Sequence, residues 1–427
     1  MHQHYQHVCI EGRFAPLAVV AQLADSGLLT DYVVYEQGER WYVAGNPVHE
    51  VRVDARTIRV GERTSPWSGA PWELLHSALH EAPVRDWHAY GWLAFELASG
   101  AGTDTPLAHL MVPGTEVTVT EAQVSVRTLD PDLPDRLRKV LAGTPRAACA
   151  PKPVDVHDTR RTYQGHVAHA VAEIGRGRLD KVILSRTVPV PFPVDMTATY
   201  LAGRTANNPA RSFLLDLAGI QAAGFSPETV IEVPGDGTAT TQPLAGTRAL
   251  TGDPDTDAAL RMQLHRDPKE VYEHATSVKL AVEELSGVGV PGTTRVGEFL
   301  TVKPRGSVQH LASRVTTDLA AGRTAWDALG AVFPPVTASG IPKQAAYQLI
   351  RELEAEPRGL YAGAVLRAGA DGSLDAALVL RAVYQQDGRA WLRAGAGVVG
   401  ASRPAREYEE TCEKLRSVAP YAVPREG

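Results

Sequence analysis

Strand-like segments joined by Asp-Gly turns place the strongest constraint on how this chain can fold. Three apolar segments near the C-terminus, residues 360–368, 374–385 and 389–399, are separated by Asp371-Gly372 and Asp387-Gly388. Asp-Gly pairs adopt the positive backbone φ angles that tight hairpin turns require. The three segments are therefore predicted to form an antiparallel meander.

The first third of the chain repeats this pattern. Residues 32–35 and 41–44 are strand-like and flank Gln37-Gly38, which predicts another hairpin. Residues 71–80 and 133–142 have helical periodicity, but helices and strands do not alternate regularly along the chain. Antiparallel strands with helices outside them predict an α+β fold with a large antiparallel β-sandwich core.

A change in composition suggests where this first part ends. Residues 144–156 are rich in Ala and Pro and follow Gly143, which is typical of a linker. We expect residues 1–150 to form a strand-rich N-terminal subdomain of the same fold. The strand expected at residues 181–189 belongs to the second part.

One helix start is well marked. Asp267 is the expected N-cap, Pro268 occupies the first helical position, and Glu270 is placed to complete a capping box. Apolar residues then recur with helical spacing and predict the buried face of this helix. They are Val271, Ala275, Val278, Val282 and Leu285.

Composition excludes several classes of function. The 427 residues carry a net charge of −6, without long runs of one sign, and this is no basis for binding nucleic acid or an anionic membrane surface. No apolar stretch approaches the roughly 20 residues needed to cross a bilayer, and the N-terminus lacks a signal-peptide pattern. The three cysteines form no CxxC pair. These features predict a soluble cytoplasmic protein.

Gly395, Gly397 and Gly400 form a G-x-G-x-x-G sequence, which is found at many dinucleotide sites. Such a site opens a βαβ unit of about 30 residues or more, and here only residues 401–427 follow, without an apparent second strand. The glycines therefore indicate a close approach of the backbone to another group. Their amide groups could bind a carboxylate as readily as a phosphate.

Two predicted helix starts each carry a pair of glutamates three residues apart: Glu270 with Glu273, and Glu407 with Glu410. Residues with this spacing share one helical face, so each pair could offer oxygen ligands to one ion. Four carboxylates without a cysteine cluster favour a hard cation such as Mg²⁺. The alternative is that these residues only stabilise the helix ends, and capping alone would account for Glu270.

Two further residues could transfer protons. Lys181 opens an apolar strand, where it is either a solvated strand end or a desolvated base facing a cleft. Glu228 follows Ser226-Pro227 between two apolar strands, where burial could keep its carboxyl protonated as a general acid.

Nine stretches of the chain, in order and nearly without gaps, resemble the chorismate-utilising enzymes, which include anthranilate, aminodeoxychorismate, isochorismate and salicylate synthases. The resemblance covers residues 157–420, which it identifies as a chorismate-binding catalytic core, and implies a fold like that of anthranilate synthase component I. The stretches are KVILSR (181–186), FSPETV (225–230), PLAGTRAL (243–250), DPKEVYEH (267–274), GSVQHLAS (306–313), VTASGIPK (336–343), RGLYAGAV (358–365), LRAGAGVV (392–399) and REYEETCEKL (406–415).

The resemblance implies a role for each candidate residue. Lys181 matches the base that activates water for attack at C2 of chorismate, where the aminating members carry glutamine. Glu228 matches the acid that protonates the departing C4 hydroxyl. Glu273, Glu407 and Glu410 match Mg²⁺ ligands, with Glu270 beside them as a ligand or its neighbour.

Other matching residues are implied to hold the substrate. Tyr361 and Arg381 match residues that bind the pyruvyl carboxylate, the amides of Gly395 and Gly397 lie near the substrate carboxylates, and Lys414 matches a lysine near the metal. Thr247 and His310 match positions lining the ring. The alternatives from the residues alone are a structural turn for Thr247 and a satisfied core residue for His310.

Within the family, the chain resembles the siderophore-type salicylate synthases. The implied reaction is water addition at C2 with loss of the C4 hydroxyl, giving isochorismate, followed by elimination of pyruvate to give salicylate. An isochorismate synthase that stops after the first step is the alternative within the family. A non-catalytic chorismate-binding regulatory subunit is the alternative from another class. The resemblance implies a monomer, and no glutamine amidotransferase segment is recognisable.

Overall fold

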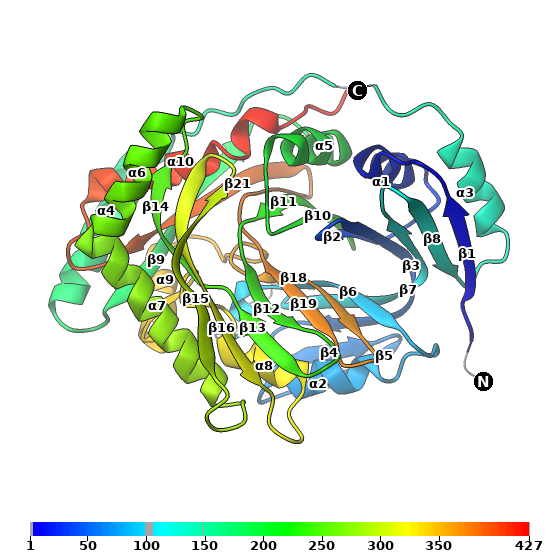
Figure 1. Ribbon diagram of the computed structural model, residues 1–427, viewed down its shortest axis with the longest axis horizontal. Helices are drawn as coiled ribbons and strands as arrows, with labels where there is room; N and C mark the ends of the chain where they lie inside the picture. Colours follow the sequence, from blue (N-terminus) through cyan, green and yellow to red (C-terminus); the bar gives the residue numbers. More distant parts are fainter. Residues whose placement is uncertain (1–2, 99–105, 148, 427) are drawn as a thin grey trace.

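The computed structural model describes residues 3–98, 106–147 and 149–426. Figure 1 shows the strands at the centre of the molecule and the helices around them. Every pairing between named strands in the described residues is antiparallel, and two runs of strands diverge from β7 (Ala108–Val119). The predicted α+β architecture, an antiparallel core with helices outside, is confirmed.

The first run crosses the sheet in the order β1, β8, β7, β3, β2, β10, β11, β20, β21, β9, β17. Its bounds are β1 Gln6–Glu11, β8 Gln123–Thr128, β3 Arg40–Val53, β2 Tyr32–Gln37, β10 Arg211–Leu217, β11 Ile220–Ser226, β20 Ala382–Gln386, β21 Arg389–Val398, β9 Lys181–Val190 and β17 Gly340–Ile341.

The second run continues from β7 through β6, β18, β19, β12, β13 and β16, with β14 and β15 also paired to β16. A short extension, β4 and β5, pairs with β3. The bounds are β6 His88–Leu93, β18 Ala364–Gly369, β19 Leu374–Leu378, β12 Thr229–Val233, β13 Thr238–Thr241, β16 Val308–Asp318, β14 Leu244–Ala249, β15 Arg295–Arg305, β4 Thr57–Val60 and β5 Arg63–Pro66.

The helices lie on the outer surfaces of these strands, with α4, α6, α7 and α10 grouped on one side in Figure 1. No helix among the described residues is both long and apolar enough to cross a membrane. The helix bounds are α1 Pro16–Asp25, α2 Pro71–Leu79, α3 Leu133–Leu141, α4 Arg160–Gly175, α5 Met196–Ala206, α6 Pro254–Arg266, α7 Pro268–Ser286, α8 Ala325–Val332, α9 Lys343–Leu353 and α10 Pro404–Leu415.

The predicted hairpins form, but the predicted meander does not. Strands β2 and β3, β18 and β19, and β20 and β21 pair across their turns, and both Asp387 and Gly388 have positive φ. Residues 374–385, however, do not form one strand. The chain breaks between β19 and β20 at Arg381, whose φ is +53°, and passes from the second run of strands to the first.

The start of α7 also differs in part from the prediction. The Asp267 carboxylate accepts hydrogen bonds from the backbone N–H groups of Lys269 and Glu270, so the predicted N-cap is confirmed. The capping box is wrong, because the Glu270 carboxylate accepts from the Thr247 N–H at 3.0 Å and pairs with Arg248 at 3.1 Å. Burial against β14 gives Glu270 these partners in place of its own helix end.

The two parts of the chain share their sheets. Strand β2 pairs with β10, and β6 pairs with β18, so strands from the first 150 residues complete both runs. The predicted linker contains no regular secondary structure in its described residues, and Ala148 lies outside them. Its Lys152 and Val154 N–H groups donate to the carbonyls of Ala422 and Ala419. The linker therefore runs along the C-terminal segment.

Candidate functional site

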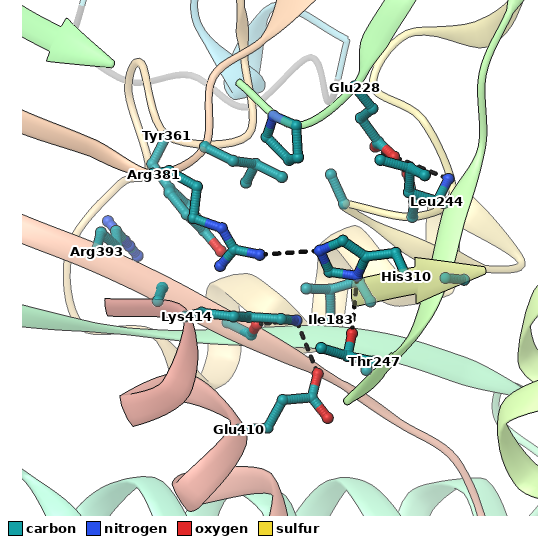
Figure 2. A pocket seen from close by; sticks show the side chains of 18 of the residues that line it. Ile183, Glu228, Leu244, Thr247, His310, Tyr361, Arg381, Arg393, Glu410 and Lys414 are labelled. Carbon is teal, nitrogen blue, oxygen red and sulfur yellow. Dashed lines mark hydrogen bonds and ion pairs between the residues drawn. The ribbon is translucent and has the colours of Figure 1, made fainter. Parts of the chain in front are cut away.

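One pocket collects most of the predicted site residues. Strands β9, β14, β16 and β21 and helices α7 and α10 contribute to it, together with the break that precedes β20. Figure 2 shows Arg381, His310, Thr247, Lys414 and Glu410 pointing toward one another in this pocket. The predicted residues that line it are Glu228, Thr247, Glu273, His310, Tyr361, Arg381, Gly395, Gly397, Glu410 and Lys414.

Glu228 lies at one end of the pocket, in the turn between β11 and β12. Its side chain is buried, Thr337 Oγ1 donates to one carboxylate oxygen at 2.7 Å, and the Leu244 N–H donates to the other at 2.8 Å. Burial raises the pKa of Glu228 to about 7. A carboxyl group with this value can hold a proton at neutral pH and deliver it to a leaving group.

Lys181 is buried, not a solvated strand end. Only 2 % of the residue is exposed. Its Nζ lies 2.9 Å from Glu273 Oε1 and donates to Ser277 Oγ at 3.2 Å, so the side chain faces α7. Lys181 does not itself line the pocket, but Glu273 lies between it and the pocket and does.

Arg381, His310 and Thr247 form a chain of polar contacts across the pocket (Figure 2). Arg381 Nη2 lies 3.3 Å from His310 Nε2, and His310 Nδ1 lies 3.1 Å from Thr247 Oγ1. Burial, together with the charges of Arg381 and Lys414, holds the pKa of His310 well below its usual value. The ring is therefore neutral: it accepts from Arg381 at Nε2 and donates from Nδ1 to Thr247.

Arg381 retains binding capacity in this arrangement. Its Nε is buried and has no hydrogen-bond partner among the described residues, and burial lowers the pKa of the guanidinium to about 10. A buried donor without a partner costs free energy that an anionic ligand would recover. Tyr361 is also buried and lines the same part of the pocket, where burial raises the pKa of its hydroxyl.

The register of β21 against β9 explains the two glycines. Gly395 and Gly397 lie opposite Ser185 and Ile183, whose N–H groups donate to Glu354 and to the Ser339 carbonyl instead of to β21. These are therefore the non-hydrogen-bonded pairs of the ladder, and the glycine amides point away from β9. Because β20 pairs with β21 only as far as Leu392, this edge faces the pocket.

The glycines also leave room for neighbouring groups. A Cβ on Gly397 would lie 2.3 Å from Glu273 Oε1, and one on Gly395 would lie 2.7 Å from the Leu184 carbonyl oxygen. Lys414 closes this side of the pocket. It donates to the Gly395 carbonyl at 2.9 Å and pairs with Glu410 at 2.7 Å.

The four glutamates predicted as metal ligands, Glu270 and Glu273 on α7 and Glu407 and Glu410 on α10, are all buried, and each contacts a cation. Glu273 pairs with Lys181, and Glu410 with Lys414. The Lys269 ammonium lies 3.1 Å from Glu407 Oε1 and 3.7 Å from Glu270 Oε1. Glu273 and Glu410 line the pocket directly, whereas Glu270 and Glu407 lie outside its lining. Glu270 contacts the lining through the Thr247 N–H.

Comparison with known proteins identifies the family. The sequence model of the family described as chorismate binding enzymes matches residues 31–420. A salicylate synthase from Mycolicibacterium paratuberculosis is 44 % identical over 410 residues, which cover 93 % of this chain and 90 % of the relative. The chain belongs to the chorismate binding enzyme family. It is therefore a chorismate-utilising enzyme.

Solved structures agree with this assignment. Anthranilate synthase component I from Streptococcus pneumoniae superposes with a TM-score of 0.76 at 26 % identity, covering 90 % of this chain and 92 % of that one. The menaquinone-specific isochorismate synthase from Escherichia coli superposes with a TM-score of 0.74 over 98 % and 95 % of the two chains. At 21 % identity, the second comparison shows the shared fold alone.

The glutamates of this chorismate binding enzyme have the chemistry of a site for a divalent cation. Burial and the neighbouring Glu410 raise the pKa of Glu407 to about 7 and also raise that of Glu270. Against its burial, Lys414 and Lys269 hold the pKa of Glu410 to about 2. Glu407 Oε2 is buried without a hydrogen-bond partner among the described residues. Closely spaced carboxylates with an unpartnered oxygen fit Mg²⁺.

The side chains are not arranged around one ion as they stand. Among the described residues, no three His, Cys, Asp or Glu side chains are placed to hold a metal together. The Lys269 ammonium instead lies between Glu270 and Glu407. A divalent ion would therefore have to compete with lysine for these carboxylates.

Several residues of the site have functions that the sequence did not predict, although they lie in the stretches that resemble the chorismate-utilising enzymes. Arg393 lines the pocket and pairs with the buried Glu354 at 2.6 Å. Thr337 holds Glu228, and Lys269 connects the two helices that carry the glutamates. Arg393, Thr337 and Lys269 stand in LRAGAGVV, VTASGIPK and DPKEVYEH, so position in those stretches was the available signal.

The pocket is nearly filled by its own side chains, with a cavity of about 60 Å³. Small-molecule sites commonly enclose roughly 300 Å³ or more. The contacts that occupy the space are Arg381 with His310 and Lys414 with Glu410. Long flexible side chains make these contacts, so rotation of Arg381 and Lys414 would open room for a substrate.

Proposed function

We propose that this enzyme is a magnesium-dependent salicylate synthase that uses water as its nucleophile. The observation that carries the proposal is a protonatable glutamate and a buried lysine at one pocket. Glu228 lines the pocket and has a pKa near 7, and Lys181 contacts Glu273, which also lines the pocket. The salicylate synthase relative that matches 93 % of the chain supports the choice of product.

The first step exchanges one hydroxyl for another. Lys181 takes a proton from water as the water oxygen bonds to C2 of chorismate, both ring double bonds shift by one position, and the C4–O bond breaks. Glu228 protonates the departing C4 oxygen, which leaves as water, and the product is isochorismate. Glu273 and Ser277 lie where they would stabilise the ammonium that Lys181 acquires.

The second step eliminates pyruvate. The C3–O bond breaks while the hydrogen at C2 moves to the methylene carbon of the enolpyruvyl group, so pyruvate leaves and the ring becomes aromatic. This transfer needs only that the enolpyruvyl group be held over the ring. Tyr361, Arg381 and the amides of Gly395 and Gly397 would hold the substrate carboxylates; all four residues line the pocket, and the unpartnered Arg381 Nε supports this role.

Glu273, Glu407 and Glu410, with Glu270 beside them, would hold Mg²⁺, which would supply positive charge for the ring carboxylate in a protein whose own net charge is −6. Lys414 adds a second cation on the same side of the pocket. Water as nucleophile makes an amidotransferase subunit unnecessary, and we propose a monomer. The three free cysteines suit a cytoplasmic enzyme.

Product analysis tests the proposal. Purified protein is incubated with chorismate and Mg²⁺, and the products are separated by chromatography over time. We expect salicylate and pyruvate in equal amounts, with isochorismate only transient. Isochorismate without pyruvate would make the enzyme an isochorismate synthase. Thermal stabilisation by chorismate without any product would indicate a binding subunit.

Two variants test the assigned residues in the same assay. Lys181→Gln removes the proposed base, and Glu228→Gln removes the proposed acid while preserving its size and its contact with Thr337. We expect each to lose at least about 10²-fold in kcat, the usual contribution of a general acid or base. Wild-type turnover by either variant would remove that residue from the mechanism.

A further inference from the structure

A second, smaller cavity lies beside Glu228. Its volume is about 10 Å³, and Glu228 and Thr337 line both this cavity and the substrate pocket. Its other walls include Thr241, Gln242 and Glu284. Glu228 therefore separates the substrate pocket from a small internal space that other polar side chains also reach.

This cavity has the size of one water molecule. About one probe sphere of space, on the order of 10 Å³, suffices for a buried water if two or more polar groups can bind it. Each Glu228 carboxylate oxygen accepts one hydrogen bond, from Thr337 or from the Leu244 N–H, and each can accept another. Glu284 and Gln242, which also line the cavity, offer further partners.

Glu284 connects the cavity with the surface of the molecule. It lies in the last turns of α7, where its carboxylate is 2.6 Å from the ammonium of Lys343, and both side chains are slightly less than one fifth exposed. Burial raises the pKa of Glu284 and lowers that of Lys343, so a proton can be shared within the pair. The other charged or titratable groups near Glu284 are Glu283 and Tyr347.

The proposed reaction creates a need for such a connection. Each conversion of chorismate to isochorismate takes a proton from Glu228 and leaves one on Lys181. Before the next turnover Lys181 must therefore release its proton to water and Glu228 must gain one. We propose that Glu284, whose side chain is partly exposed, takes a proton from bulk water and passes one to Glu228 through a water molecule held in the cavity. This inference rests on the proposed function, because it presumes that Glu228 acts as the acid.

This transfer of a proton from Glu284 to Glu228, the proton relay, acts between turnovers and leaves the first turnover unaffected. It therefore has a distinct kinetic signature. In Glu284→Gln the first equivalent of chorismate should react at the wild-type rate, because Glu228 begins protonated. Later turnovers should be at least tenfold slower at pH 6, below the pKa of Glu228, because glutamine cannot pass a proton to the water in the cavity. Rapid-quench measurements of pyruvate should therefore show a burst of one equivalent that the wild-type enzyme lacks.

Three further variants complete the experiment. Glu283→Gln changes the neighbouring exposed carboxylate and should behave as wild type, and Glu284→Asp should recover most of the steady-state rate. Ala281→Val fills the cavity while leaving Glu284 in place, and should produce the same burst by displacing the water. This last variant tests the relay independently if Glu284→Gln fails to fold.

The outcomes separate the relay from the proposed function. Wild-type steady-state rates in both Glu284→Gln and Ala281→Val would overturn the relay and leave the proposed function standing. Slowing of the first turnover in the same proportion as later ones would also overturn it, because that pattern indicates a structural role. No consumption of chorismate by the wild-type enzyme would overturn the proposed function and the relay together.

Discussion

Replacing Glu354 with glutamine should strongly lower the free energy of unfolding of this enzyme. The Glu354 side chain is only 4 % exposed and accepts from the Ser185 N–H. Arg358 donates to both of its carboxylate oxygens, and Arg393 donates to one of them. Both arginines are buried as well. Glutamine would keep the volume of the side chain but remove its negative charge. Among the described residues, Glu354 is the only carboxylate that forms an ion pair with both arginines.

The structure gives the size of the effect. Against its burial, Arg358 and Arg393 hold the pKa of Glu354 to about 2, below the ordinary value near 4.5 for glutamate. This difference corresponds to about 3 kcal/mol of stability. Breaking a buried ion pair by removing one partner commonly costs roughly 3–5 kcal/mol. We therefore expect Glu354→Gln to lower the free energy of unfolding by about 3 kcal/mol at pH 7.

The assay is urea denaturation followed by circular dichroism, with Glu356→Gln as the matched control. Glu356 pairs with Arg389 near the same turn, but more than half of each side chain is exposed, so the control should change by less than about 1 kcal/mol. A loss for Glu354→Gln no larger than that of the control would refute the reasoning.

The pH dependence checks the same reasoning with its sign. Because the pKa of Glu354 is lower in the folded protein, its contribution is fully present above about pH 4.5 and is lost as the pH falls toward 2. The difference in stability between wild type and Glu354→Gln should therefore shrink as the pH falls through this range. A difference that stays constant would place the effect in packing and not in charge.

Four further predictions concern activity. Because Glu228 must be protonated and its pKa is about 7, kcat/KM should fall about tenfold per pH unit above 7; a profile that stays flat to pH 9 would contradict this. Gly397→Ala should fold but lose activity, since the new methyl group displaces the Glu273 carboxylate. The control is Gly400→Ala, whose methyl group would lie 3.7 Å from its nearest neighbour; it should match wild type in both circular dichroism and turnover. EDTA should abolish product formation and Mg²⁺ restore it, and full activity in EDTA would return the glutamates to a structural role. Lys181→Gln should form isochorismate at least about 10²-fold more slowly than wild type, and ammonia supplied as an ammonium salt should be tested as an alternative nucleophile. Unchanged isochorismate formation would exclude Lys181 as the base.

Local features of the fold could be predicted because local chemistry determines them. The Asp-Gly turns of the two C-terminal hairpins and the Asp267 cap of α7 follow from backbone preferences within a few residues. The break at Arg381 could not be predicted, because a positive φ at arginine is imposed by its surroundings. There the chain passes from β19 to β20, which pair with different strands.

The buried face of α7 shows the same limit. The apolar spacing of Val271, Ala275 and Val282 predicted one face, but these residues are only partly buried, while Val278 and Leu285 are buried as predicted. The helix instead buries Glu270, Glu273, His274 and Ser277. Polar residues can be buried where they find hydrogen-bond or ion-pair partners. Here Lys181, Thr247 and Ser313, on other elements, are those partners.

The candidate site was predictable only through family resemblance. Its residues come from β9, β14, β16, β21, α7 and α10, which long-range strand pairing brings together. From single residues, Lys181 could have been a solvated strand end and Glu270 a helix cap, and the structure shows both to be buried among other side chains. Their proposed roles in catalysis and metal binding remain predictions.

The measurement that tests the central claim most directly is the origin of the phenolic oxygen of the product. The enzyme is incubated with chorismate and Mg²⁺ in H₂¹⁸O, and the salicylate is analysed by mass spectrometry. If water attacks C2 and the C4 hydroxyl is lost, each salicylate carries one ¹⁸O at its hydroxyl group and the pyruvate released in that step carries none from the reaction. Salicylate with an unlabelled hydroxyl would show that water is not the nucleophile and would contradict the mechanism proposed for Lys181 and Glu228.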